Sequence, residues 1–181
     1  YQSNSSIKGA IQRMYSSSEA MDAKGLAINI AWIAASLVVI AFAAWLIKRL
    51  CEEHLLVDAQ MVTALTLLLI SPVSWSHHWV WLTLIIPVFL YRAWSWLSTG
   101  WAAGSLLTIL VAWSAMLLTV PPKWWWGDQV DVHAMERYQK FWVDDFVWLT
   151  ILTVALFAAA FYASQRNNRN ANTATPAPLA S

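Results

Sequence analysis

The chain has 181 residues, of which 59% are hydrophobic and 12% are charged, and its formal net charge at pH 7 is +1. A soluble domain usually carries about twice that charged fraction, so the composition argues against an ordinary soluble protein. The small net charge provides no broad field that would attract nucleic acid. A single cysteine, Cys51, excludes an internal disulfide and provides no metal-ligand cluster.

Residues 1–24 form a polar segment at the start of the chain. The first residue is Tyr1 rather than Met, and no signal-peptide pattern follows it. We therefore expect the sequence to be a fragment of a longer protein.

Five apolar runs follow this segment, and a spanning helix needs roughly 20 such residues. The runs cover residues 25–47, 55–70, 79–91, 100–120 and 146–163. They lack the alternation of barrel strands, and only helices or closed barrels can cross lipid. We expect an all-α, polytopic transmembrane bundle of about five spans over residues 25–163, with loops at 71–78 and 121–145. Residues 164–181 are rich in Asn, Thr, Ala and Pro, and are expected to form a disordered tail.

An odd number of spans places the two ends of the chain on opposite sides of the membrane. The two loops follow the second and the fourth span, which places them on the same side as the polar segment. The basic residues divide five against six between the two sides. The five are Lys48, Arg49, Arg92, Arg166 and Arg169, and the six are Lys8, Arg13, Lys24, Lys123, Arg137 and Lys140. The five lie directly at helix ends, whereas acidic residues dilute the six. We therefore expect the five in the cytoplasm, and the polar segment and loops outside the plasma membrane.

The loop at 71–78 carries most of the candidate chemistry. His77 and His78 lie at or near membrane depth, where ionisable groups usually face a bundle interior or a wet cavity. Either imidazole could donate to a phosphate oxygen of a lipid-linked substrate or to a sugar hydroxyl. The alternative is that both only cap a helix at the interface. Adjacent helical residues do not share a face, so we expect no metal chelate there.

Three further features each have two interpretations. In the segment 4–13, Lys8 and Arg13 could meet lipid phosphates, or the segment could be a solvated linker. Trp124, Trp125 and Trp126 could stack on sugars or form an aromatic belt at the headgroup level. Asp58 could relay protons, or it could simply interact with the positive end of its helix dipole. By residue type alone, Glu136, Asp144 and Asp145 are candidate bases.

Two segments resemble elements of glycosyltransferase family 87, which includes actinobacterial polyprenyl-phosphate-mannose-dependent α-mannosyltransferases and related arabinofuranosyltransferases. Residues 68–81, LLISPVSWSHHWVW, resemble the family signature SP-(I/V)-SW-x-HH-W. Residues 4–13 resemble its element NQS-(L/I)-x-G-x-x-x-R: Asn4, Ser6, Gly9 and Arg13 match, and Ser5 replaces the usual Gln. The order and spacing of the two elements also agree with the family.

The resemblance implies a GT-C type fold with an extracytoplasmic active site, and it implies that this chain is the C-terminal part of such an enzyme. It implies transfer of mannose from polyprenyl-phosphate-mannose to a phosphatidylinositol mannoside or lipomannan-type glycolipid, with an α-1,2 linkage. The implied partners are this donor, the glycolipid acceptor and membrane lipids, with no nucleic acid, cofactor or metal. An arabinofuranose donor stays open, and so does a transporter or flippase segment for a lipid-linked sugar.

The resemblance also implies roles for individual residues. Arg13, His77 and His78 would bind the donor phosphate, and Asn4 and Trp75 would contact the sugar or the acceptor. The general base would lie outside this chain, because family members hold it in an earlier outward loop. The chain alone is therefore expected to be inactive.

Overall fold

The computed structural model describes residues 4–127 and 131–174, and this part of the chain is helical without strands. The helices are α1 (Ile7–Arg13), α2 (Ser18–Ala23), α3 (Gly25–Glu52), α4 (Leu56–Ile70), α5 (Leu82–Ser95), α6 (Trp101–Leu118), α7 (Arg137–Val143) and α8 (Asp145–Ala174). Four short 3-10 helices connect them: η1 (Ser76–Trp81), η2 (Leu97–Thr99), η3 (Pro122–Trp124) and η4 (Val132–Ala134). The expected all-α membrane bundle is confirmed.

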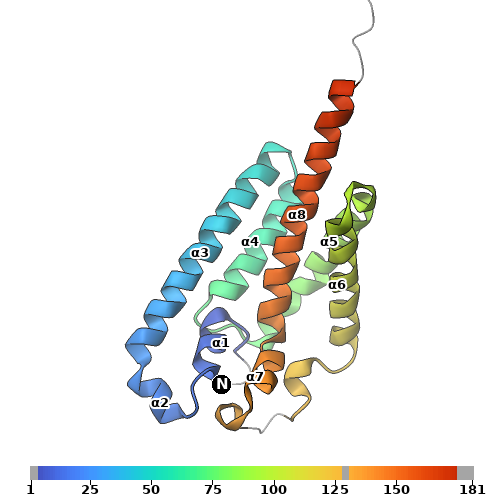
Figure 1. Ribbon diagram of the computed structural model, residues 1–181. Helices are drawn as coiled ribbons and strands as arrows, with labels where there is room; N and C mark the ends of the chain where they lie inside the picture. The colour runs from blue at the N-terminus through green and yellow to red at the C-terminus, as the bar shows by residue number, and fades with distance from the viewer. Residues whose placement is uncertain (1–3, 128–130, 175–181) are drawn as a thin grey trace, which may run out of the picture.

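The five expected apolar runs correspond to α3, α4, α5, α6 and α8 (Figure 1). By length and composition, α3, α6 and α8 can cross a membrane, whereas α4 is a shorter apolar helix of 15 residues. The chain leaves α4 at Ser71-Pro72 because proline lacks the N–H that would continue the helix. It re-enters helical structure through η1, which contains both histidines and leads directly into α5.

The packing places α8 inside the bundle and α3 at its edge. In the most apolar window of each helix, 56% of α8 residues are buried but only 17% of α3 residues. Phe157 of α8, Phe89 of α5 and Leu106 of α6 belong to one fully buried core. Exposed Leu and Ile side chains on α3, such as Leu37 and Ile30, suit a lipid-facing surface, because lipid tails are as apolar as these side chains.

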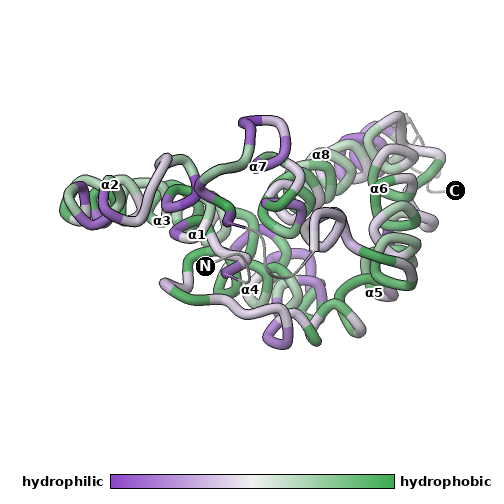
Figure 2. Tube along the Cα trace, turned by 90° about the horizontal axis from the view of Figure 1, so that it is seen from below, coloured by the Kyte–Doolittle hydropathy of each residue, from purple (hydrophilic) through white to green (hydrophobic). Residues whose placement is uncertain are grey.

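The two ends of the bundle differ in composition. We call the end with α1, α2, residues 71–81 and α7 the polar end; it lies at the bottom of Figure 1. Figure 2 views the molecule from this end, where hydrophilic stretches of α2 and α7 lie beside largely hydrophobic helices. We call the other end, with residues 48–56, 92–101 and 164–174, the basic end. The polar segment and both loops thus meet at one end, as expected for loops that follow the second and the fourth span.

The expected tail differs from the structure between residues 164 and 174. These residues continue α8 without a break, and the side chain of Ser164 is buried. Adding residues to an existing helix requires no new nucleation, so a polar sequence can extend it where it could not start one. Residues 175–181 lie outside the described part of the chain, as do residues 1–3 of the polar segment.

Candidate functional site

The Asn4 side chain joins the N-terminal segment to the turn that follows α4. Its amide Nδ2 donates to the carbonyl of Pro72 (3.1 Å), and its Oδ1 accepts from the backbone N–H of Ser74 (2.9 Å). The backbone N–H of Ser5 donates to the carbonyl of Ser74 (2.7 Å). Backbone groups left free by the break at Pro72 are thereby satisfied, as buried backbone groups require.

Ser6 and Gly9 fit the first turn of α1 against Asn4. The Ser6 hydroxyl accepts from the backbone N–H of Gly9 (3.3 Å), which caps the helix, and donates to Asn4 Oδ1 (2.9 Å). A Cβ atom on Gly9 would lie 2.2 Å from the Asn4 carbonyl oxygen, so only glycine fits there. The residue types at the Asn, Ser and Gly positions of the 4–13 element are therefore explained by how α1 packs and bonds against Asn4.

Arg13 connects the same segment to the start of α8. Its side chain is buried; Nε donates to Asp144 Oδ1 (2.7 Å), Nη1 donates to the Asn4 carbonyl (2.9 Å), and Nη2 also pairs with Asp144. Burial raises the pKa of the Asp144 carboxyl above its ordinary value, and the charge and hydrogen bonds of Arg13 oppose that rise. We call Asn4, Ser6, Gly9, Arg13 and Asp144 the clamp.

The two histidines lie next to each other in η1, and both are exposed. Their ring centroids are 4.3 Å apart at an interplanar angle of 75°. His78 Nδ1 accepts from the backbone N–H of Trp75 (3.2 Å). This geometry assigns the proton of the neutral His78 ring to Nε2, which is then free to donate to a ligand.

His78 lines a groove between α4 and η1, with a volume of about 470 Å³. The lining combines an apolar wall with polar side chains: Gln60, Met61, Thr63, Ala64, Leu67, Leu68, Ser71, Ser74, His78 and Trp81. The Ser74 hydroxyl oxygen is buried and has no hydrogen-bond partner among the described residues. A hydroxyl without a protein partner keeps its O–H available as a donor. We call this space the His78 groove.

His77 lines a second groove, of about 610 Å³, between η1, α5 and α6. Trp79 and Phe146 form part of its wall, and the Trp79 and Phe146 ring centroids are 5.1 Å apart. The buried indole N–H groups of Trp79 and Trp113 have no hydrogen-bond partner in the described residues. His77 and His78 thus line different grooves.

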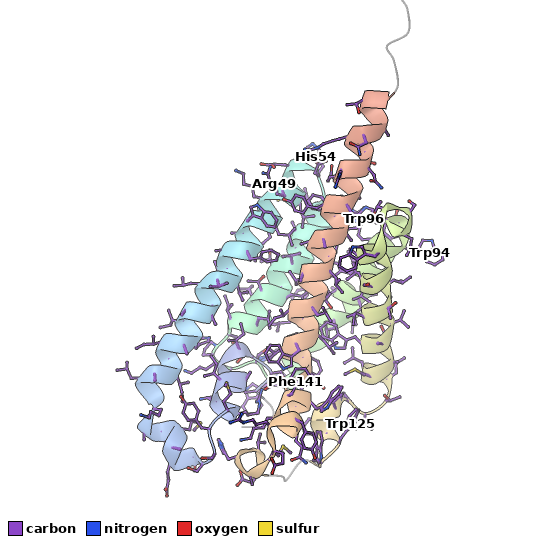
Figure 3. All side chains as sticks on the ribbon, in the orientation of Figure 1. Arg49, His54, Trp94, Trp96, Trp125 and Phe141 are labelled. Atoms are coloured by element: carbon purple, nitrogen blue, oxygen red, sulfur yellow. The ribbon has the colours of Figure 1, made fainter. Side chains whose placement is uncertain are left out.

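Trp75 and the tryptophans of the 121–145 loop lie outside both grooves. Trp75 is 39% exposed beside η1. Trp125 packs near Trp142, with ring centroids 5.7 Å apart, and donates its indole N–H to the Val120 carbonyl (2.9 Å). Figure 3 shows Trp125 and Phe141 at the polar end, and Trp94 and Trp96 near the basic end. Aromatic residues near both ends are typical of interfacial belts.

The structure thus brings all five predicted site residues to the polar end, but in two different settings. His77 and His78 are exposed at the grooves, whereas Asn4 and Arg13 are buried and bonded to protein groups. A direct contact between Arg13 and a phosphate would require Asp144 to be displaced. The partnership of Asp144 with Arg13 was not predicted, because 131 positions separate them. The sequence carried no signal for Gln60 as a groove residue, whereas Ser74 lies in the 68–81 signature.

Comparison with known proteins finds no matching family model and no matching solved structure. Among curated proteins, the chain is 28% identical over 156 residues to a polyprenol-phosphate-mannose-dependent α-(1-2)-phosphatidylinositol mannoside mannosyltransferase of Mycobacterium tuberculosis; this covers 83% of the chain and 34% of the relative. It is 36% identical over 91 residues to a protein of that name from Mycolicibacterium smegmatis, covering 44% of the chain and 21% of the relative.

A third relative is a polyprenol-phosphate-mannose-dependent α-(1-2)-phosphatidylinositol pentamannoside mannosyltransferase of Mycobacterium tuberculosis. It is 32% identical over 117 residues, which are 65% of the chain and 23% of the relative. The chain thus spans about a third or less of the length of these relatives. The resemblance seen in the two motifs is confirmed: the chain is related in sequence to the polyprenol-phosphate-mannose-dependent α-(1-2)-mannosyltransferases.

Proposed function

We propose that this chain is part of a membrane mannosyltransferase of the GT-C type. The enzyme takes mannose from polyprenyl-phosphate-mannose and forms an α-1,2 linkage to a phosphatidylinositol mannoside or related glycolipid. The names of the three relatives support this donor and acceptor. The structural observation that carries the proposal is the His78 groove, whose lining combines an apolar wall with polar side chains.

The His78 groove suits the two parts of a polyprenyl phosphate. Ala64, Leu67 and Leu68 on α4 would contact the isoprenoid chain. His78 Nε2–H and the unpartnered hydroxyl of Ser74 would donate to the phosphate oxygens. Hydrogen bonds to an ionised phosphate are stronger than those between neutral groups, and a protonated His78 would strengthen them further.

In this proposal the residues of the chain act on the leaving group. As the bond between the anomeric carbon and the carrier phosphate breaks, negative charge grows on that phosphate. Donors already held in place stabilise the charge without reorganising. Proton abstraction from the acceptor hydroxyl is assigned to a carboxylate outside this chain. In the structure, Asp144 pairs with Arg13, and Asp145 Oδ1 accepts from the N–H of Phe146. The chain alone is expected to bind the carrier lipid and not to transfer mannose.

The clamp has a positioning role in this scheme. The Asn4 side chain binds the backbone of Pro72 and of Ser74, on both sides of Val73. His78 lies four residues after Ser74 in the same turn. Arg13 holds the Asn4 carbonyl and is itself held by Asp144. A mobile turn would lose the alignment on which preorganised donors depend. We therefore assign Arg13 and Asn4 to the support of the phosphate site; their direct contact with substrate stays a prediction from the resemblance.

The polar end is assigned to the extracytoplasmic side of the plasma membrane. Cys51 at the basic end is an exposed free thiol and reports this orientation directly. In intact cells, a membrane-impermeant maleimide is expected to leave Cys51 unlabelled until the membrane is permeabilised. Labelling without permeabilisation would reverse the orientation.

The carrier-lipid site is tested with a photoreactive polyprenyl phosphate and the chain reconstituted in lipid nanodiscs. Crosslinks are expected on α4 between Gln60 and Leu68. His78→Ala is expected to reduce crosslinking about tenfold, the loss of one charge-assisted donor. His54→Asn is the matched control: it removes a histidine at the basic end, and asparagine tolerates the positive φ of 58° found there. Equal crosslinking in His78→Ala and the control would contradict the site.

Transfer is tested in the intact enzyme. His78→Ala is expected to lower mannosyl transfer from polyprenyl-phosphate-mannose, and a wild-type rate would contradict the role of His78. Turnover by the isolated chain would contradict the assignment of the base to a region outside it. For the transporter alternative, the structure shows Asp58 with both carboxylate oxygens bonded to Arg92, and no observation favours an ion-coupling role.

A further inference from the structure

A third groove lies at the basic end, far from the histidines. It has a volume of about 370 Å³ and lies between the last turns of α3 and the C-terminal part of α8. Its lining is mostly polar and contains three arginines: Arg49, Glu52, Glu53, Phe161, Tyr162, Gln165, Arg166, Arg169 and Asn170. We call it the arginine groove. The mannosyltransferase proposal makes no use of it.

The cations of the arginine groove outnumber the carboxylates that pair with them. Arg49 pairs with Glu52 (3.0 Å), and Glu52 also lies 3.9 Å from Lys48, so two cations share one carboxylate. Within residues 4–127 and 131–174, Arg166 and Arg169 have no ion pair with a carboxylate. They are three positions apart on α8, which places them on one helix face. The groove therefore presents two guanidinium groups that are available to an anion.

The position of the arginine groove fits the headgroup level of a bilayer. Arg166 and Arg169 follow the apolar stretch of α8, and Arg49 follows that of α3. About one turn before these arginines on each helix, Trp45 of α3 stacks on Tyr162 of α8, with ring centroids 5.2 Å apart. Trp and Tyr concentrate at the membrane–water interface, where the phosphates of lipids also lie. Figure 3 shows Arg49 at this end, beside the part of α8 that extends beyond the bundle.

We propose that the arginine groove binds the phosphate headgroup of an anionic membrane lipid. Guanidinium groups bind phosphate through paired N–H donors, and their stems pack against apolar surface. Phe161 and Tyr162 supply that surface for the glycerol and the first carbons of the acyl chains. Basic pockets between helices are known as sites for anionic lipids, and each basic residue near such a surface strengthens binding about fivefold. A free phosphate has the same headgroup chemistry but lacks the apolar part.

The test is native mass spectrometry of the whole chain in detergent, titrated separately with phosphatidylglycerol, phosphatidylcholine and inorganic phosphate. The wild type is expected to bind phosphatidylglycerol more tightly than phosphatidylcholine. The double variant Arg166→Gln/Arg169→Gln is expected to bind phosphatidylglycerol about twenty-five-fold more weakly. The control Lys24→Gln/Arg137→Gln removes the same charge from exposed positions at the polar end and is expected to bind as the wild type does.

A loss of lipid binding can also result from misfolding, whereas a gain of affinity cannot, so a variant that is expected to bind more tightly is tested as well. Glu52→Gln frees Arg49 and Lys48 from their shared carboxylate, and is expected to tighten phosphatidylglycerol binding several-fold. Equal binding by the wild type and the double arginine variant would overturn the proposal, and so would an unchanged affinity in Glu52→Gln. Competition by inorganic phosphate at the concentration where the lipid binds would show an anion site without lipid specificity, which also overturns it. None of these outcomes bears on the His78 groove.

Discussion

Each end of the bundle contains one buried aspartate paired with an arginine, and the two pairs are built differently. At the polar end, Arg13 and Asp144 are 131 positions apart, and their side chains are 2% and 8% exposed. At the basic end, Asp58 and Arg92 are 34 positions apart, and both Asp58 oxygens accept from Arg92 (2.8 and 2.7 Å). The Arg92 side chain is 25% exposed, and its guanidinium lies 5.9 Å from the centre of the Trp96 ring.

The two pairs differ in sequence separation and in burial, and not in the support that the helix ends give them. Asp58 lies in the first turn of α4 and Arg92 in the last turn of α5, where the helix dipoles favour those charges even before they pair. Arg13 lies in the last turn of α1 and Asp144 directly precedes α8, so the helix dipoles favour these charges as well. This pair, however, forms only after α1 has packed beside the start of α8. Burying an ion pair is expensive, and an apolar pair is often at least as stable. This agrees with the clamp serving to position the turn rather than to add stability.

The largest expected effect comes from breaking the buried pair on one side. Asp144→Ala leaves the Arg13 cation enclosed without its counter-charge, which typically destabilises a protein by about 3–5 kcal/mol. The free energy of unfolding in detergent, measured by titration with a denaturing surfactant, checks this. The double replacement Arg13→Met/Asp144→Leu is the control and should recover most of the loss. If it recovers none, the pair carries stability in its own right.

The next effect tests how closely α1 fits against Asn4. Gly9→Ala puts a Cβ 2.2 Å from the Asn4 carbonyl oxygen, and overpacking of this kind costs about 1–3 kcal/mol. Gly104→Ala in α6 is the matched control, because nothing lies within 4 Å of its added Cβ, and helix propensity there favours alanine. In the same unfolding titration, Gly9→Ala should have a lower free energy of unfolding than the wild type. Gly104→Ala should have an equal or a higher one. Equal stability of the two variants would show that the clamp tolerates displacement.

A smaller effect is expected from the pair at the basic end. Asp58→Ala removes the partner of Arg92, but Arg92 is partly exposed and can turn towards water or lipid phosphates. We expect a loss of about 1–2 kcal/mol, less than for Asp144→Ala. Comparing the two variants in one detergent measures the contrast between the two ends directly. A greater loss of stability in Asp58→Ala than in Asp144→Ala would contradict this contrast.

The smallest effect is a pH dependence that arises from Asp144. Its folded-state pKa is raised from 3.8 mainly by burial, so the folded chain binds a proton more tightly than the unfolded chain. The contribution of this group is therefore greatest at low pH and is lost as the pH rises through the raised pKa. Unfolding measured upward from pH 3.8 in the wild type and in Asp144→Asn isolates it: the difference in stability should fall with rising pH. A difference that rises with pH would mean that Arg13 outweighs burial.

The sequence by itself determined the parts of this protein that depend on neighbouring residues. Long apolar runs predict helices because a backbone in lipid must satisfy its own hydrogen bonds, and all five runs appear as helices. Pro72 and the histidine doublet marked the turn that carries the grooves. The two motifs also pointed correctly to the mannosyltransferase relatives.

Only the tertiary structure shows which polar side chains are bonded to other protein groups and which can still bind a ligand. No local pattern shows that Arg13 is held by Asp144, that Asn4 supports the turn, or that His77 and His78 line separate grooves. The pattern of hydrophobic residues predicts which side chains become buried. It does not predict a buried hydrogen bond between residues 131 positions apart, because that bond depends on how the helices pack. The helical continuation from 164 to 174 has the same origin, because a polar sequence too weak to begin a helix can extend one that packing has already stabilised.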